Sequence, residues 1–528
     1  MITGKAHLNN SDFPEPPEPE QTNPKIDHEA LLSYDRGNIV KLLDDAQSSP
    51  SPTVVPIPPR ITSNVSRPEC RNPFNEEIDL PAIVKELLSV TEDMTSSTFV
   101  FDASEGAAAT NWDILCNHNF DLTTIIGNER NHTSFGSELK QIEWLEKLWW
   151  KHPRWNRLKK SLTNGVTFPV RHLDEELRRQ DVIAAFTRGN HKSAFHKKCF
   201  LENEIVKEVK KGWNILLPGD TYDKLPGLVL SPMGVATHTG ICSDGTFVEK
   251  DRVTHDLSFP GAASKESVNS RVISTELEPC MFSYVLLRLI HYVVNLRRRH
   301  RESRIWLRKE DYKSAFRRIH LSAKTALEAA VTVEIAQKKY IAIPLRMPFG
   351  GAPCPSEFAL FSDMITDTIN DLLKDKNWDN TTIFSDVIKD IPPPIPLPDN
   401  IPFSQAKPMR VELPDEDFGK ADVFLDDIIS CIVDKGDNLD RITKAPSTII
   451  EATARQGSTM GVKRDPMIEP EKAKAEGPAE EVKIILGWTI DTRRLLISLP
   501  KHKFIGWTSQ IDSVLDSKTV SNKTLMSV

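Results

Sequence analysis

Cysteine is scarce in this chain of 528 residues, and the seven cysteines are scattered, odd in number and never spaced C-x-x-C. That pattern excludes a disulfide framework and a zinc ribbon or knuckle, and it favours a reducing compartment. Internal repeats and a secretory signal are also lacking, and the most apolar helix-length stretch, 280–296, is interrupted by Arg288 and His291. We therefore expect an intracellular protein of the cytoplasm or nucleus, with no membrane partner.

Positive charge is in slight deficit, with 67 Lys and Arg against 74 Asp and Glu and a formal net charge of −7. This total alone would argue against a nucleic-acid partner. The charge is, however, unevenly distributed along the chain. Residues 1–100 carry 8 basic and 16 acidic side chains, whereas residues 140–320 carry 33 basic and 21 acidic ones. A polyanion would therefore meet a basic middle region.

Two proline-rich stretches interrupt the pattern of a folded protein. The first 75 residues hold 12 of the 37 prolines together with many acids, so residues 1–100 are expected to be a disordered, acidic leader. A second stretch holds 8 prolines between 391 and 414, which predicts an inserted surface loop near 385–418. Between them, residues 101–200 are expected to form a helical N-terminal extension.

The spacing of the apolar residues predicts the main helices and strands. Helices are expected over 137–151, 202–212, 281–296 and 356–373. Strands or hairpins are expected over 247–259, 304–312, 331–345, 421–433 and 482–499. A basic, aromatic run follows the first of these helices, so a nucleic-acid contact is one interpretation of that helix. Docking of the amphipathic helix on the protein's own core is the favoured one.

Asp426 and Asp427 are the strongest chemical signal in the sequence. Apolar and β-branched residues flank them on both sides, the pattern of a buried hairpin, whereas Asp44 and Asp45 in the leader are read as solvated charge. Adjacent carboxylates among apolar strands repel each other and lose solvation unless a cation neutralises them. Oxygen ligands alone favour Mg²⁺ or Mn²⁺.

Asp311 is a second candidate carboxylate, at the end of an expected strand and 115 residues before Asp426. Aspartates at the ends of two different strands can hold two metal ions roughly 3.5–4 Å apart, an arrangement suited to in-line phosphoryl transfer. One ion would activate an attacking hydroxyl, and the other would stabilise a leaving pyrophosphate.

Five segments together resemble the motifs of reverse transcriptases, and they occur in that family's order. D-Y-K-S-A-F at 311–316 resembles motif A, and F-L-D-D at 424–427 resembles the catalytic motif C. The segment at 347–358, which begins M-P-F-G-G, resembles motif B. I-L-G-W at 485–488 resembles the primer-gripping hairpin, and K-D-R-V-T-H-D-L at 250–257 resembles the fingers strand. The resemblance is closest to retrotransposon polymerases of the gypsy and DIRS-like groups.

The resemblance implies an α+β, right-hand polymerase. It implies fingers over 201–300, a palm over 301–498 with an antiparallel sheet backed by helices, and the start of a truncated thumb over 499–528. The implied activity is RNA-directed DNA polymerisation as part of a retrotransposon. The implied partners are an RNA or DNA template with a primer and deoxynucleoside triphosphates. Separate chains could supply RNase H and an integrase or recombinase.

The resemblance also implies a role for each residue that matches a motif. Asp311, Asp426 and Asp427 would be catalytic and, with a backbone carbonyl near Tyr312, would hold two Mg²⁺ ions, with Mn²⁺ as an alternative. The nucleotide-binding residues would be Lys250 and Arg252 at the triphosphate, Phe316 as a gate against a 2′-hydroxyl, and Phe349 and Gly350 in the pocket. The primer grip would be Leu486, Gly487 and Trp488.

Two alternatives remain open. An RNA-dependent RNA polymerase is one, although Phe316 counts against it. A catalytically inactive, nucleic-acid-binding relic is the other, favoured by the roughly thirty residues that remain for a thumb. The basic residues before motif A are equally well read as a solvated face or as phosphate contacts. They are Arg297, Arg298, Arg299, His300, Arg301, Arg304, Arg308 and Lys309.

Overall fold

The computed structural model describes most of the chain from residue 78 onward. It covers residues 78–517 and 519, apart from gaps at 92–97, 130–137, 242–246, 278–279, 281, 388–391, 407–418, 456–457, 460–461, 464–465 and 469. Every described residue belongs to one compact unit, Ser63–Val528. The expected leader up to residue 77 lies outside the described residues.

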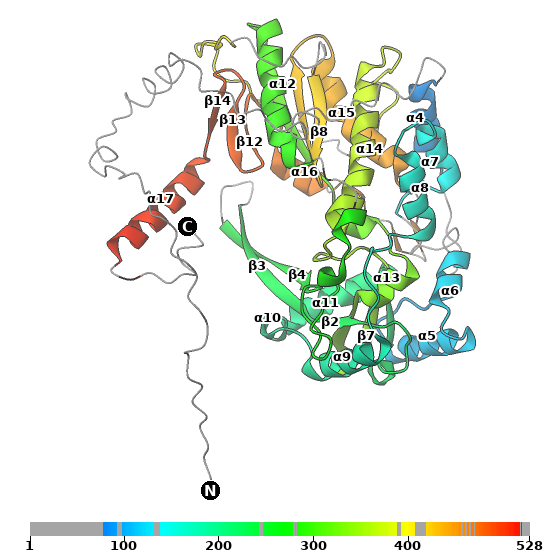
Figure 1. The fold of residues 1–528 in the computed structure, drawn as a ribbon. Coiled ribbons are helices and arrows are strands. Elements are labelled where there is room, and N and C mark those ends of the chain that lie inside the picture. Colours follow the sequence, from blue (N-terminus) through cyan, green and yellow to red (C-terminus); the bar gives the residue numbers. More distant parts are fainter. Residues whose placement is uncertain are drawn as a thin grey trace. The chain divides into compact units, whose positions relative to one another are not determined.

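Helices precede the first strand in the described part of the chain (Figure 1). They are α4 (Leu80–Ser89), α5 (Glu105–Asn117), α6 (Leu122–Glu129), α7 (Ile142–Trp149), α8 (Trp155–Asn164), α9 (Glu175–Arg188), α10 (Lys192–His196) and α11 (Lys198–Lys210). Side chains of Asp79, Ser104 and Asp174 accept hydrogen bonds from the first-turn N–H groups of α4, α5 and α9. The end of α11 near Gly212, which has a φ of +73°, confirms the predicted helix stop.

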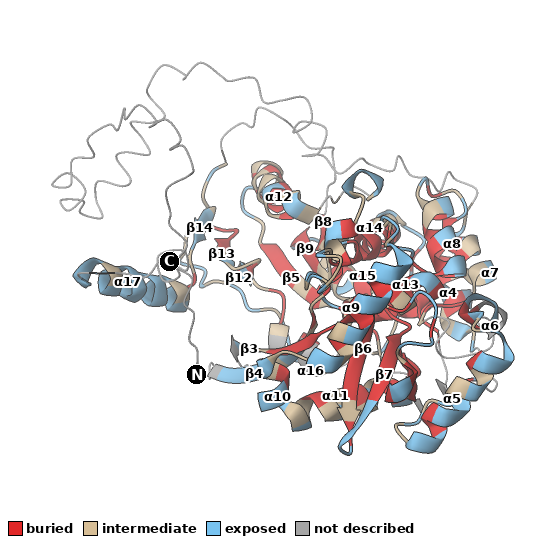
Figure 2. Ribbon diagram, turned by 60° about the horizontal axis from the view of Figure 1, so that its bottom comes forward, coloured by how far each residue is buried: buried red, intermediate tan, exposed pale blue. Residues whose placement is uncertain are grey.

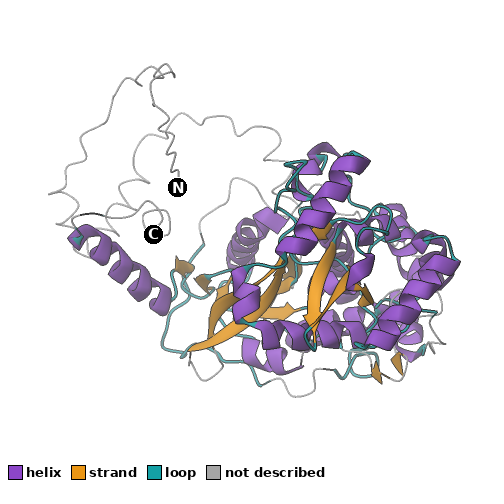
Figure 3. Ribbon diagram, turned by 90° about the horizontal axis from the view of Figure 1, so that it is seen from below, coloured by secondary structure: helices purple, strands orange, loops and turns teal. Residues whose placement is uncertain are grey.

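The strands form several small sheets, seen among the helices in Figure 3. One mixed sheet has the order β1-β7-β6-β2, from β1 (Asn214–Pro218), β2 (Leu230–Ser231), β6 (Ala330–Ile335) and β7 (Lys338–Pro344). The other sheets are antiparallel. Two of them have two strands: β3 (Met233–Ile241) pairs with β4 (Phe247–His255), and β10 (Ser458–Thr459) pairs with β11 (Val462–Lys463). Two have three strands, in the order β5 (Ile305–Asp311), β9 (Asp427–Val433), β8 (Gly419–Phe424) and in the order β12 (Val482–Ile485), β13 (Trp488–Asp491), β14 (Leu496–Ser498).

Further helices alternate with these strands, so the fold is of the α+β class with small sheets. They are α12 (Val285–Arg299), α13 (Ala323–Glu328), α14 (Cys354–Lys374), α15 (Asn438–Thr453), α16 (Pro470–Glu476) and α17 (Lys501–Asp516). The predicted helices and strands are confirmed in type, with shifts of a few residues at their ends. One detail differs: residues 482–491 form a complete hairpin on their own, and β14 adds a third strand.

The sheet β5-β9-β8 lies between two helical layers. On β5, Ile305 and Leu307 belong to one apolar cluster with α12, whereas Trp306 belongs to the large cluster that includes α14 and α15. Both faces of the sheet are therefore buried, as the red colouring of these strands in Figure 2 shows. This burial explains the nearly continuous apolar sequence of β9.

The helical N-terminal region docks on the long helix α14. The indole Nε1 of Trp149 donates a hydrogen bond to Thr368 Oγ1 at 2.9 Å, and Arg154 Nη1 lies 2.7 Å from Asp363 Oδ2. The buried residues of α7 include Leu145, Leu148 and Trp149. These contacts confirm that α7 packs on the protein's own core.

The structure differs from the expected segments in two places. Residues 80–89, counted with the disordered leader, form α4, because Leu80, Val84 and Leu87 provide an apolar face that is buried. The mixed sheet joins strands from both sides of the expected boundary at residue 300.

The proline-rich segment has no helix and no strand in its described part, residues 392–406. Ile395 forms an isolated bridge with Glu480, so this part lies against the sheet region. In the part of the chain that the structure describes, no helix combines the length and apolar character of a membrane-spanning segment.

Candidate active site

The three predicted catalytic aspartates meet at one end of the β5-β9-β8 sheet. Asp311 is the last residue of β5, and it lies directly opposite Asp427, the first residue of β9. Asp426 occupies the turn before β9, and its carbonyl oxygen accepts a hydrogen bond from the Tyr312 N–H at 3.2 Å. Residues paired in this way point to the same face of a sheet. The structure thus places Asp311 and Asp426, which are 115 residues apart in sequence, at the same end of one sheet.

A tight turn holds the Asp426–Asp427 pair in place. Phe424 pairs with Asp427, so only Leu425 and Asp426 connect β8 to β9. Leu425 has a φ of +56°, a left-handed conformation that suits the first central position of a type II′ turn. A leucine there costs about 1–2 kcal/mol relative to an unstrained backbone. Strain of this kind is often retained at functional sites.

The end of the sheet that carries Asp311, Asp426 and Asp427, here called the carboxylate corner, disfavours the ionised forms of Asp426 and Asp427. Burial raises the pKa of Asp427 to about 6, although Lys309 Nζ lies 3.0 Å from its Oδ1 and acts in the opposite direction. Burial also raises the pKa of Asp426, against the positive charges of Lys309 and Arg252. The cations present therefore compensate only part of the cost of keeping these aspartates ionised.

The donor set suits a hard divalent cation, but it is not assembled around one. Carboxylate oxygens at a partly buried sheet edge are ligands of the kind that Mg²⁺ prefers, and a cation would offset the desolvation that raises the pKa of Asp426 and of Asp427. Among the described residues, no group of three or more His, Cys, Asp or Glu side chains converges closely enough to hold a metal ion. Lys309 also bridges Asp427 to Glu476, at 3.0 and 3.2 Å. The two-ion site remains a proposal.

Tyr312 contributes its backbone to this corner and its side chain to the core. The ring centroid lies 5.6 Å from that of Phe358 and 6.1 Å from that of Phe361. Burial raises the pKa of the Tyr312 hydroxyl well above its usual value. This side chain therefore packs as a neutral core residue, and a metal contact through the nearby main chain stays a prediction.

Phe316 and Phe349 form an aromatic pair beside the carboxylates. Phe316 lies in the short 3-10 helix Ala315–Arg318, and its ring centroid is 5.1 Å from that of Phe349 and 5.6 Å from that of Phe358. Phe349 is 46% exposed, whereas Phe358 is buried. The two predicted nucleotide-pocket aromatics are thus in contact with each other, and one of them is accessible to a ligand.

Gly350 is required by the backbone that follows Phe349. Its φ is +114°, and a Cβ atom there would lie 2.0 Å from the carbonyl oxygen of His255 at the end of β4. Asn269 holds the same loop, since Nδ2 donates to the Gly350 carbonyl and Oδ1 accepts from the Ala352 N–H, both at 2.8 Å. No local sequence pattern points to Asn269, because its two partners lie more than 80 residues away.

Lys250 and Arg252 lie on β4 with exposed side chains. Residues alternate between the two faces of a strand, and Asp251 between them is paired with Lys197 at 3.0 Å. Lys250 and Arg252 therefore share the opposite face. The effect of Arg252 on the pKa of Asp426 shows that its charge reaches the carboxylate corner.

Leu486, Gly487 and Trp488 form the tip of the β12–β13 hairpin. Leu486 and Gly487 have φ values of +48° and +84°, the pattern of a two-residue type I′ turn, and Trp488 is 39% exposed. The predicted hairpin is confirmed. Its role as a primer grip stays a prediction.

The basic run before motif A is only partly a surface feature. Arg297 is 1% exposed and donates to the carbonyl oxygens of Ser303 and Thr492, at 2.6 and 3.2 Å. Arg308 is buried beside Glu310, with their nearest atoms 2.6 Å apart. The phosphate-contact interpretation is therefore wrong for these two arginines, whose donors are directed inward.

Comparisons with known proteins give little guidance. No family model and no curated protein matches the chain. Among solved structures, it is similar to the foamy viral protease-reverse transcriptase dRH in complex with double-stranded DNA, with 13% identity, a TM-score of 0.30, and 75% of this chain and 50% of that chain covered. It is also similar to the foamy viral protease-reverse transcriptase with double-stranded DNA, with 14% identity, a TM-score of 0.30, and coverage of 61% and 44%.

The chain thus spans about half the length of these solved structures. Both likenesses are too low to assign this chain to a family or to transfer an activity.

Proposed function

We propose that the chain is an RNA-directed DNA polymerase of a retrotransposon, resembling the gypsy and DIRS-like groups in its motifs. The observation that carries this proposal is the cross-strand placement of Asp311 opposite Asp427, with Asp426 in the strained turn between β8 and β9. Burial raises the pKa of Asp426 and of Asp427, so their charges are a cost to folding that a structural role does not explain. A reaction that needs cations there accounts for them.

In this proposal each residue near the corner has a distinct task. Asp311, Asp426 and Asp427 hold Mg²⁺, which supplies activation of the primer hydroxyl and charge stabilisation at the phosphates. Lys250 and Arg252 bind the triphosphate of the incoming nucleotide by charge. Their side chains lie on the face of β4 opposite the Asp251–Lys197 pair, and the charge of Arg252 reaches Asp426.

The aromatic pair and the two glycine turns complete the proposed substrate site. Phe316 excludes a 2′-hydroxyl, so the substrates are deoxynucleoside triphosphates, and Phe349 and Gly350 line the nucleotide pocket. Leu486, Gly487 and Trp488 hold the primer end. The template is RNA or DNA.

Extension of a labelled primer on RNA and DNA templates tests the proposal. We expect Mg²⁺-dependent addition of deoxynucleotides, and a loss of about a hundredfold or more in Asp426→Asn. Asp434→Asn is the matched control, since Asp434 directly follows the opposite end of β9. Equal extension by Asp426→Asn and the parent would show that this residue is wrongly assigned. A preference for ribonucleotides would instead indicate an RNA-dependent RNA polymerase.

A second candidate is a nucleic-acid-binding protein without catalysis. Its supporting observation is Lys309, whose ammonium group already binds Asp427 at 3.0 Å in a corner where the described acidic residues do not converge as a metal site. Salt-sensitive binding of a primer–template by the parent, without incorporation of a single nucleotide at any Mg²⁺ or Mn²⁺ concentration, would favour this candidate.

A further inference from the structure

The proline-rich segment is docked on the protein through the few donors that it has. Residues 392–398 read P-P-P-I-P-L-P, so only Ile395 and Leu397 carry a backbone N–H. Ile395 donates to the carbonyl oxygen of Ala479 at 3.0 Å, and Leu397 donates to Glu481 Oε2 at 2.9 Å. Both available N–H groups are thus directed at residues 479–481.

These residues continue the sheet that carries Asp311. Leu307 of β5 and Glu480 exchange two backbone hydrogen bonds, of 2.8 and 3.0 Å, and Ile395 pairs with Glu480 in parallel. The proline segment therefore follows the outer side of residues 479–481. Proline is suited to such an edge, because it has no N–H to leave unpaired there.

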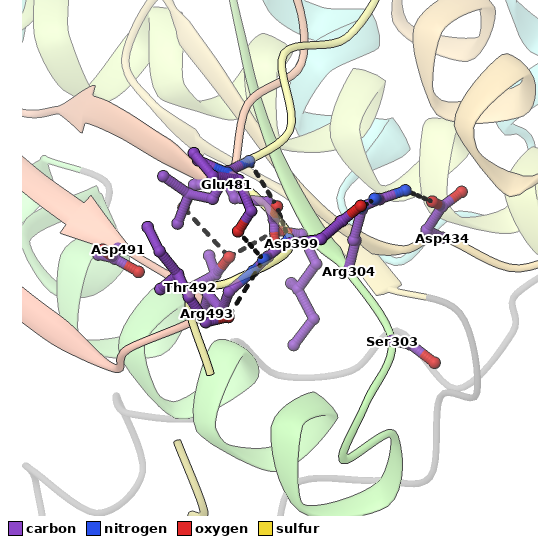
Figure 4. Close-up of polar contacts among 12 residues, drawn as sticks. Ser303, Arg304, Asp399, Asp434, Glu481, Asp491, Thr492 and Arg493 are labelled. Atoms are coloured by element: carbon purple, nitrogen blue, oxygen red, sulfur yellow. Dashed lines mark hydrogen bonds and ion pairs between the residues drawn. The ribbon is translucent and has the colours of Figure 1, made fainter. Parts of the chain in front are cut away.

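A buried ion pair fixes the base of the β12–β13 hairpin to the same segment. Glu481 directly precedes β12, Arg493 follows β13, and both side chains are almost fully buried. Arg493 contacts Glu481 through Nε and Nη2, at 2.9 and 2.5 Å. Its Nη1 donates to the carbonyl oxygens of Pro398 and Ile401, at 2.9 and 3.3 Å. Figure 4 shows this arrangement around Glu481 and Arg493.

Phe403 adds an aromatic contact to this joint, which consists of Glu481, Arg493 and residues 398–401. The guanidinium carbons of Arg297 and Arg493 lie 4.8 and 4.5 Å from the centroid of its ring. The neighbouring Ser404 N–H donates to the Arg493 carbonyl oxygen at 2.9 Å. The exposed pair Arg304–Asp399, at 2.9 Å, adds little, since exposed ion pairs are weak.

The joint also connects the hairpin to the carboxylate corner. Thr492 Oγ1 donates to the Ile305 carbonyl oxygen at 2.6 Å, and Ile305 begins the strand that ends at Asp311. We propose that residues 392–406 act as a brace, a positioning element that sets the orientation of the β12–β13 hairpin, and hence of Leu486–Gly487–Trp488, relative to the aspartates. The primer-binding part of this inference rests on the function proposed above.

Phe403→Ala in the full chain tests the brace without removing a buried charge. Gln405→Ala, an exposed neighbour in the same segment, is the matched control, and Phe403→Tyr keeps the ring. The first readout is hydrogen exchange of the backbone N–H groups of residues 482–491, which needs no activity. We expect about threefold to tenfold faster exchange in Phe403→Ala and parental rates in the other two variants.

The second readout separates binding from chemistry. We expect the Kd for primer–template to rise about threefold to tenfold in Phe403→Ala, while nucleotide addition by the saturated complex stays within about twofold of the parent. Parental hydrogen exchange in the hairpin of Phe403→Ala would overturn the brace. If exchange rises but the parent extends no primer, the brace stands and the proposed polymerase function fails.

Discussion

Two groups of acidic side chains in the same unit are balanced in different ways. On α14, Glu357 and Asp363 are each matched by one arginine of the N-terminal helical region, Arg157 and Arg154. At the end of β5, Asp427 is paired with Lys309, and the charges of Lys309 and Arg252 act on Asp426. The first group connects α14 to the N-terminal helical region, since each of its carboxylates is paired with an arginine.

In the second group, the nearby cations do not offset the burial of Asp426 and Asp427. Burial raises the pKa of Asp426 and of Asp427, which means that the folded protein keeps these ionised carboxylates at a cost. A local conflict of this kind between charge and burial is typical of a functional site. The difference between the two groups can be tested by removing charges from each.

The largest expected effect is the loss of activity without loss of stability in Asp311→Asn. Removing one of the three proposed catalytic carboxylates should lower nucleotide addition by about a hundredfold or more. The free energy of unfolding should stay equal or increase, because Asp311 lies directly opposite Asp427 and like charges in such a cross-strand pair are destabilising. Primer extension and urea unfolding at the same pH measure the two quantities. A clearly destabilised variant would show that Asp311 is a structural partner instead.

His255, near Arg317 and Glu208, provides a test in which burial lowers a pKa, whereas burial raises the pKa of Asp426 and of Asp427. Burial lowers the pKa of His255 to about 4, and the charge of Arg317 acts in the same direction, against that of Glu208. The unfolded chain binds this proton near pH 6.5, so the stabilising effect of neutral His255 is complete above that pH and is lost as the pH falls toward 4.

We therefore expect the parent to lose about 2 kcal/mol more stability than His255→Gln between about pH 7.5 and about pH 5. Urea unfolding of both proteins at the two pH values gives this difference. Parallel loss in the two proteins would mean that His255 takes up its proton in the folded state as readily as in the unfolded one.

Breaking the ion pair between Arg157 and Glu357 should lower stability and leave nucleotide addition unchanged. Arg157→Met leaves Glu357, which is 3% exposed, without its arginine, and we expect a loss of about 1–2 kcal/mol in the free energy of unfolding. The double variant Arg157→Met/Glu357→Met should recover most of that loss, because an apolar pair of similar volume needs no counter-charge. Nucleotide addition per folded molecule should stay near the parental rate in both. No recovery in the double variant would show that the pair contributes through more than its balanced charge.

The sequence was sufficient for features that depend on neighbouring residues. Asp311 and the turn that presents Asp426 follow from short motifs, whereas the requirement for glycine at position 350 comes from the carbonyl oxygen of His255, which is distant in sequence. The burial of the arginines was harder to predict. In the sequence Arg297 resembles surface charge, but in the structure it donates to the carbonyl oxygen of Thr492, which is distant in sequence. Pairings such as Arg157 with Glu357 leave no local pattern, since the partners lie 200 residues apart.

The smallest expected effect concerns Lys309, whose ammonium group contacts Asp427. Its ammonium lies 3.0 Å from Asp427 and 3.2 Å from Glu476, so it repels any cation placed at the same carboxylate. In Lys309→Met we expect Mg²⁺ to reach half-maximal effect at about threefold to tenfold lower concentration, whereas Lys309→Arg should resemble the parent. The Mg²⁺ dependence of primer extension provides the measurement, and calorimetric titration with Mg²⁺ repeats it without turnover. Weaker Mg²⁺ binding in Lys309→Met would mean that the lysine orients Asp427 for the metal, and the two acidic groups would then both depend on a fixed cationic partner.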